Sequence, residues 1–331
     1  MASTKQGKRR LAAKAAAATA AIATIQPAGG LQKANGRPAA VYLARLGPGS
    51  RRGMLQALQV LARLLTDGTV PPEALPWHLV RYQHAAAIRA RLAAMYAPRT
   101  VNRYLTALRG VLKECWRLGL LDADTYGRTA DVEAIKVETL PAGRALGQDE
   151  RLALFEACGR DTGSAGRRDA AVLAVLYGGG LRRAEVVALD LEDVDLTAGS
   201  LKVAGKGGKE RLAYLSRSAS QLLSAWLDVR GREHGPLFVS VKQGREVGMR
   251  RLSAPTIRGL LVSRAAQAGI RHFTAHDLRR SFISDLLNAG ADIAVIQRLA
   301  GHASPVTTSR YDRRGEVAKR RAAELIAVPP R

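Results

Sequence analysis

Cysteine and aromatic residues are scarce in this chain of 331 residues, which has two cysteines and 5% aromatics. Cys115 and Cys158 lie far apart, each in an apolar helical pattern and without neighbours at metal-ligand spacing. This pattern predicts buried free thiols and argues against a disulfide framework or a zinc site. The cysteine usage therefore indicates a reducing, cytoplasmic setting, and Leu, Ala and Val must supply most of the core.

Long apolar runs are also missing. The nearest candidate for a membrane span, residues 170–181, is too short to cross a bilayer. A hydrophobic content of 47% and a charged content of 24% are typical of a soluble globular protein, long enough here for two domains. We therefore expect no membrane partner.

Acidic residues are outnumbered, with 28 Asp and Glu against 52 Lys and Arg, which gives a net charge of +24. So basic a chain concentrates polyanions around itself, and nucleic acid is the usual partner. Ribosomal, membrane-surface and heparin-binding proteins share the property, so charge alone does not choose among these classes.

The chain divides by pattern into four segments. Residues 1–36 hold no acidic residue and form a basic, Ala-rich tail that we expect to be disordered; a signal peptide fits this segment less well, because its apolar run is mostly Ala and Thr. Residues 37–132 predict a helical DNA-binding domain, residues 133–146 a hinge linker, and residues 147–331 a second domain ending in a tail helix.

Helical periodicity dominates both domains. The first predicts helices over 51–65, 78–96 and 100–118, the last with a basic face opposite its apolar one that suits phosphate contacts. In the second, three strands are expected within 193–215, with a hairpin turn at Ala198-Gly199. The other helices are predicted over 150–158, 167–177, 216–230, 254–268, 275–289, 293–300, 305–311 and 317–326.

Three segments of the second domain carry chemistry in combination. In the first, a Gly-rich turn at 178–180 precedes Arg182 and opens a helix, while the second places Lys206 between two strands. The segment around Lys206 is not a nucleotide-binding P-loop, because it lacks the Gly-Lys-Ser/Thr ending of that motif and is not followed by a helix. In the third, His276 and Arg279 lie three residues apart on one helical face. His302 and Tyr311 follow them nine residues apart.

The order of these residues resembles the signature of tyrosine recombinases, the phage integrase family. The likeness covers residues 147–326 well and 37–130 more loosely. The matching stretches are Gly180-Leu-Arg182-Arg-Ala-Glu185, Gly205-Lys206-Gly, His276-Asp-Leu-Arg279-Arg-Ser281, Leu299-Ala-Gly-His302 and Thr307-Thr-Ser-Arg-Tyr311.

The resemblance implies Tyr311 as the nucleophile and Arg182, Lys206, His276, Arg279 and His302 as its catalytic partners. Two guanidiniums clamp the oxygens of a five-coordinate phosphorus, and a histidine transfers protons near neutral pH. Lys206 then protonates the leaving 5′ oxygen, although the nearby Lys209 is an alternative for this role. A histidine at 302 would hydrogen-bond to the phosphate. The acidic residue at 185 would support the arginine three residues before it.

The implied fold is mainly α with a small antiparallel β-sheet: a helical N-terminal core-binding domain followed by a mixed α/β catalytic domain. The implied reaction cuts and rejoins double-stranded DNA through a 3′-phosphotyrosyl bond, with strand exchange through a Holliday junction by a homotetramer on paired sites. The bond conserves the energy of the cut linkage, so we expect no ATP. The cluster is positively charged and has no carboxylate pair aimed at the phosphate, so we expect no divalent metal or other cofactor. The assembly state without DNA stays open. The short helix over 317–326 packs either on its own domain or on a neighbouring subunit.

Two other functions share parts of this pattern. A type IB topoisomerase uses the same residue types but relaxes DNA as a monomer, and the helical N-terminal domain favours the recombinase over it. A regulatory DNA-binding protein that has lost cleavage is the second alternative, and the intact set of six residues argues against it.

Overall fold

The computed structural model describes residues 37–137, 143–205, 208, 210–242 and 246–301. Contacts group the chain into two compact units, Met1–Leu140 and Pro141–Arg331. The predicted tail over 1–36 and the predicted helices over 305–311 and 317–326 lie outside the described residues.

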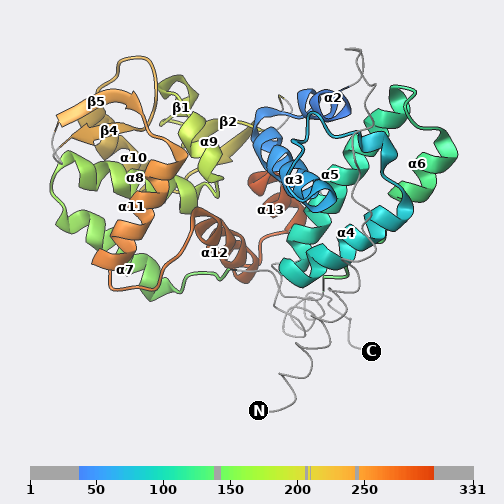
Figure 1. Ribbon diagram of the computed structural model, residues 1–331. Helices are drawn as coiled ribbons and strands as arrows, with labels where there is room; N and C mark the ends of the chain where they lie inside the picture. Colours follow the sequence, from blue (N-terminus) through green and yellow to red (C-terminus); the bar gives the residue numbers. More distant parts are fainter. Residues whose placement is uncertain (1–36, 138–142, 206–207, 209, 243–245, 302–331) are drawn as a thin grey trace, which may run out of the picture. The chain divides into compact units, whose positions relative to one another are not determined.

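The first unit is helical (Figure 1). Its central helix α5 packs against α2, α3, α4 and α6. All the positions of α5 that the periodicity turns inward are buried, from Val101 to Leu112. The described helices of this unit are α2 (Pro38–Ala44), α3 (Pro48–Thr66), η1 (Trp77–Leu79), α4 (Tyr82–Met95), α5 (Pro98–Arg117) and α6 (Ala123–Ala130).

The basic face expected on α5 is only partly free. The half-buried Arg109 donates hydrogen bonds to the carbonyls of Ala130 and Val132, which ties the segment after α6 to α5. Arg117 pairs with the buried Glu114 at 2.9 Å. These contacts stabilise the bundle, because they satisfy backbone and carboxylate groups that packing removes from water.

The second unit is built around α8, whose side chains from Ala170 to Leu176 are buried. The helix packs against α10, α7 and α12, and Figure 1 shows it among the helices of this unit. Every position from Ala170 to Leu176 is apolar, as expected for a helical stretch that is enclosed on all sides. The described helices are α7 (Gln148–Arg160), α8 (Ser164–Gly178), α9 (Arg183–Ala188), η2 (Leu191–Asp193), α10 (Arg217–Arg230), α11 (Ala254–Gln267), α12 (Ala275–Asn288) and α13 (Ile293–Ala300).

Two antiparallel sheets complete the second unit. The predicted three-stranded sheet is confirmed, with β1 (Val194–Asp195), β2 (Ser200–Ala204) and β3 (Glu210–Tyr214) in that order and with Gly199 at positive φ in the turn. A second sheet, of β4 (Val239–Lys242) and β5 (Glu246–Arg251), was not predicted. The expected fold class, mainly α with a small antiparallel sheet, is confirmed.

Both cysteines are buried and free, as predicted. Burial raises the pKa of each thiol to about 12, so neither is a reactive thiolate near neutral pH. Among the described residues, no helix is both long enough and apolar enough to span a bilayer.

Candidate active site

A glycine turn places Arg182 at the start of α9. Gly180 has φ +60, and a Cβ at this position would lie 2.4 Å from the Phe282 ring, so the turn requires glycine. The chain then enters α9 with Arg182 at its N-cap, where the Glu185 carboxylate accepts a hydrogen bond from the Arg182 backbone N–H at 2.8 Å. This hydrogen bond from the first helical turn fixes the backbone of the arginine.

Glu185 also holds the side chain of Arg182. Its Oε1 accepts from Arg182 Nη1 at 2.7 Å, and the same carboxylate accepts from both Nη atoms of Arg211, at 3.1 and 2.8 Å. Burial opposes ionisation of Glu185, yet the hydrogen bonds from Arg211 and Arg182 outweigh it and hold its pKa below the usual value. The carboxylate is therefore charged, and the supporting role expected for it has a geometric basis.

Arg279 lies in α12 and is 1% exposed. Its Nη1 donates to the carbonyl of Gly180 at 2.6 Å, and its Nη2 donates to the carbonyl of Ala300. Arg182 Nη2 donates to the next carbonyl, that of Gly301, at 3.1 Å. The two predicted phosphate-binding arginines therefore converge on the same turn and on the same helix end.

His276 lies in the first turn of α12, which begins with a capping box between Thr274 and Asp277. Its pKa is lowered, first by partial desolvation of the ring and then by the positive charges of Arg280, Arg279 and Arg182. A neutral imidazole near pH 7 can accept a proton, as the predicted role requires.

The other three predicted catalytic residues, Lys206, His302 and Tyr311, lie outside the described residues. The sequence alone places Lys206 between β2 and β3 and His302 directly after Gly301. The structure thus brings together Arg182, Arg279 and His276.

Arg211 is a residue of this site to which the sequence reasoning gave no role. It lies opposite the buried Val203 in the β2–β3 register and shares the inward face of β3 with the buried Ala213. An arginine at an inward position of a strand with period-two alternation is the signal that could have identified it, because such a charge needs a buried partner.

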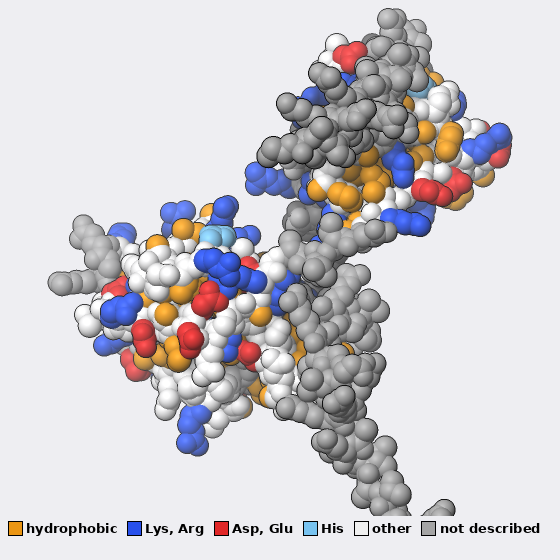
Figure 2. Space-filling view, turned by 90° about the horizontal axis from the view of Figure 1, so that it is seen from below, with side chains coloured by type: hydrophobic (Ala, Val, Ile, Leu, Met, Phe, Trp, Pro, Cys, Tyr) orange, Lys and Arg blue, Asp and Glu red, His pale blue; other side chains and the backbone are white. Residues whose placement is uncertain are grey.

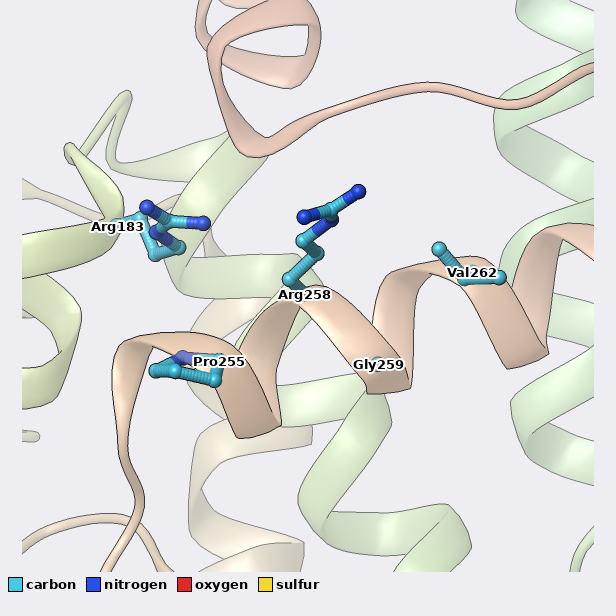
Figure 3. Close-up of a pocket in the computed structure, with 5 residues that line it drawn as sticks. All are labelled: Arg183, Pro255, Arg258, Gly259 and Val262. Atoms are coloured by element: carbon cyan, nitrogen blue, oxygen red, sulfur yellow. The ribbon is translucent and has the colours of Figure 1, made fainter.

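A second basic feature lies between α9 and α11. Arg183 and Arg258 line an open pocket of about 470 Å³ whose other walls are Pro255, Gly259 and Val262. Figure 3 shows the Arg183 guanidinium turned toward Arg258. Within the described residues, neither side chain has an ion-pair or hydrogen-bond partner, so both charges are available. Figure 2 shows further Lys and Arg side chains on the visible surface of each unit.

Comparisons with known proteins identify the family. A model of the phage integrase family matches residues 144–316. The tyrosine recombinase XerD of Mycobacterium leprae is 38% identical over 241 residues, 67% of this chain and 70% of the relative. The tyrosine recombinase XerC of Pseudomonas aeruginosa is 35% identical over 273 residues, 80% of this chain and 82% of the relative.

Among solved structures, the chain resembles a lambda integrase tetramer bound to a Holliday junction. The TM-score is 0.62 at 18% identity, over 84% of this chain and 76% of the other. This likeness concerns the fold.

The family match and the similar recombinases define a DNA strand-cleaving and rejoining enzyme. The chain belongs to the phage integrase family and is a site-specific tyrosine recombinase. Neither the topoisomerase nor the non-catalytic alternative has support among these findings.

Proposed function

We propose that Arg182 and Arg279 bind the phosphate that is cut, and that Tyr311 attacks it. The observation that carries this proposal is the convergence of the two guanidiniums, which donate to the adjacent carbonyls of Ala300 and Gly301. These two carbonyls directly precede His302 in the chain. Charge-assisted hydrogen bonds from fixed arginines stabilise the charge that develops on phosphate oxygens in the transition state.

Proton transfer completes the proposed reaction. The Tyr311 oxygen forms a bond to phosphorus as the bond to the 5′ oxygen breaks, and the phenol proton leaves toward His276, whose lowered pKa keeps the ring neutral. Lys206, or Lys209 in its place, protonates the 5′ oxygen, and His302 hydrogen-bonds to the phosphate. The 3′-phosphotyrosyl product conserves one ester linkage, so a free 5′ hydroxyl reverses the step without ATP. We propose no metal or other cofactor for this chemistry.

The proposed substrate is double-stranded DNA, and the proposed assembly is a homotetramer that exchanges strands through a Holliday junction. The resemblance to a lambda integrase tetramer on such a junction supports this assembly. The net charge of +24 and the two arginines of the Arg183–Arg258 pocket support contact with the DNA backbone. Reaction on chromosomal or mobile DNA would place the protein in the cytoplasm.

We assign the two units different tasks. Residues 37–132 form the core-binding domain, residues 133–146 the linker, and residues 147–331 the catalytic domain. Contacts hold both ends of this linker: Asn102 of α5 exchanges two hydrogen bonds of 2.8 Å with the backbone of Ile135, so its first residues pack on the first unit. Leu146 is already buried in the core of the second unit.

A nicked DNA duplex tests the proposal, because loss of the short fragment beside the nick traps the covalent intermediate. The duplex would carry a site selected by the protein from random sequences. We expect an adduct with the wild type, none with Arg182→Ala or Arg279→Ala, and an unchanged adduct with Tyr214→Phe. Tyr214 is the matched control, because it is an exposed tyrosine on β3, 53% accessible, to which no role is given. Full adduct yield in both arginine variants would contradict the assignment of the phosphate clamp.

A further inference from the structure

The C-terminal end of α13 is a meeting point for three arginines. Arg211 of β3 donates from Nε to the carbonyl of Leu299 at 3.3 Å, Arg279 of α12 donates to Ala300, and Arg182 donates to Gly301. The last carbonyls of a helix have no partner within it and carry partial negative charge. Three separate elements are therefore joined at this helix end.

Arg211 makes the most extensive contacts of the three. Both of its Nη atoms bind the Glu185 carboxylate, at 3.1 and 2.8 Å, and its side chain is 15% exposed against 8% for that of Glu185. The guanidinium also packs against Gly301, where a Cβ would lie 2.9 Å from Arg211 Nε. Gly301 has φ +61, so both its conformation and its closeness to Arg211 require glycine.

The charges around Glu185 explain why a second arginine is needed. With Arg182 as its only partner, the carboxylate would neutralise the charge that Arg182 offers to a phosphate. Arg211 contributes a second positive charge beside the carboxylate, so the three groups together keep one net positive charge. The two Nη atoms of Arg211 also hold the Glu185 carboxylate in one orientation. This carboxylate in turn orients the Arg182 side chain.

We propose that Arg211 is a positioning residue of the recombinase. It orients Glu185, and through Glu185 it orients Arg182, while it offsets the carboxylate charge so that Arg182 stays electrostatically positive toward DNA. By holding the Leu299 carbonyl it also fixes the helix end on which Arg279 and Arg182 converge. This inference rests on the proposed role of Arg182 as a phosphate ligand.

The rate of adduct formation on the nicked duplex tests the inference, measured in a single turnover with saturating full-length protein. We expect Arg211→Gln to slow the reaction by about tenfold or more, since a misplaced transition-state donor costs at least this much. The double variant Glu185→Gln/Arg211→Gln should react faster than Arg211→Gln, because it removes the carboxylate that neutralises Arg182. Arg211→Lys, which keeps the charge and loses the fork, should fall between Arg211→Gln and the wild type.

A matched pair elsewhere in the same unit separates positioning from mere stability. Arg264 is 4% exposed and binds Asp169 at 2.8 Å and Asp161 at 2.6 Å, in an arrangement like that of Arg211. Arg264→Gln should lower the melting temperature, and Arg264→Gln/Asp169→Asn should recover part of it. Neither should change the rate of adduct formation at a temperature where every variant is folded.

Two results would overturn the inference: a wild-type rate in Arg211→Gln, or a double variant no faster than Arg211→Gln while all proteins are folded and bound to DNA. The melting temperature and the DNA affinity of each variant establish those two conditions. Failure of the proposed function looks different, because then either the wild type would form no adduct with DNA or Arg182→Ala would form it in full yield.

Discussion

Gly180 offers the sharpest test of how the fold builds the site. Replacing it with alanine forces an L-residue into φ +60, which costs about 1–2 kcal/mol. The new Cβ would also lie 2.4 Å from the Phe282 ring, and relieving such overpacking typically costs about 1–3 kcal/mol. Together these penalties predict a loss of about 2–5 kcal/mol in the free energy of unfolding of the catalytic unit. At roughly 2–4 °C per kcal/mol, the melting temperature should fall by about 4–20 °C.

The same substitution should reduce catalysis beyond its effect on stability. The Gly180 carbonyl accepts a 2.6 Å hydrogen bond from Arg279, so a shifted turn displaces this guanidinium. Calorimetry gives the melting temperature, and the nicked duplex gives the rate of adduct formation in a temperature range where the variant is folded. Gly159→Ala is the matched control, because this position in α7 has no atom within 4 Å of a new Cβ. A Gly180→Ala protein that melts and reacts like the wild type would show that neither the turn nor the position of Arg279 depends on this glycine.

Three further predictions concern DNA binding, proton transfer and the buried ion pairs. Arg183→Ala and Arg258→Ala should each reduce the slope of log Kd against log salt by about 0.9, and an unchanged slope in both would exclude phosphate contacts at their pocket. His276 should titrate below pH 6.5 in NMR spectra, because partial desolvation and nearby arginines lower its pKa; a midpoint at or above 6.5 would contradict this. Its contribution to folding stability should therefore be complete above pH 6.5 and be lost as the pH falls below that value, when the unfolded chain takes up the proton first. Arg264→Leu should cost about 3 kcal/mol in unfolding experiments because it leaves the Asp169 carboxylate buried with fewer partners, and a loss below about 1 kcal/mol would show that this pair contributes little.

Periodicity predicted most of the helices. A long helix that packs on a core carries apolar residues at regular spacing along its buried face, and this spacing is visible in the sequence. The inward face of α5 from Val101 to Leu112 and the eight residues of α13 are the clearest cases. The short helix α6 was missed, since eight residues give little more than two turns of pattern. The sheet of β4 and β5 was missed as well, because β5 has no buried position and thus no alternation between buried and exposed residues.

For Arg182, His276 and Arg279 the sequence predicted a common location, and it did not predict the network that joins them. Arg182, His276 and Arg279 carry recognisable local motifs, and the structure brings them together. The link through Arg211 and Glu185 joins residues 26 positions apart on β3 and α9, and no local pattern encodes such a contact. The basic face of α5 was predicted to be free for phosphate contacts. Arg109 on this face instead donates hydrogen bonds to the carbonyls of Ala130 and Val132.

Mass spectrometry of the trapped DNA adduct identifies the residue that attacks the phosphate. After nuclease and protease digestion, the account predicts one modified peptide, with the nucleotide phosphate on the Tyr311 oxygen, and no adduct from Tyr311→Phe. A phosphate attached to any other residue, or an adduct that persists in Tyr311→Phe, would contradict the account.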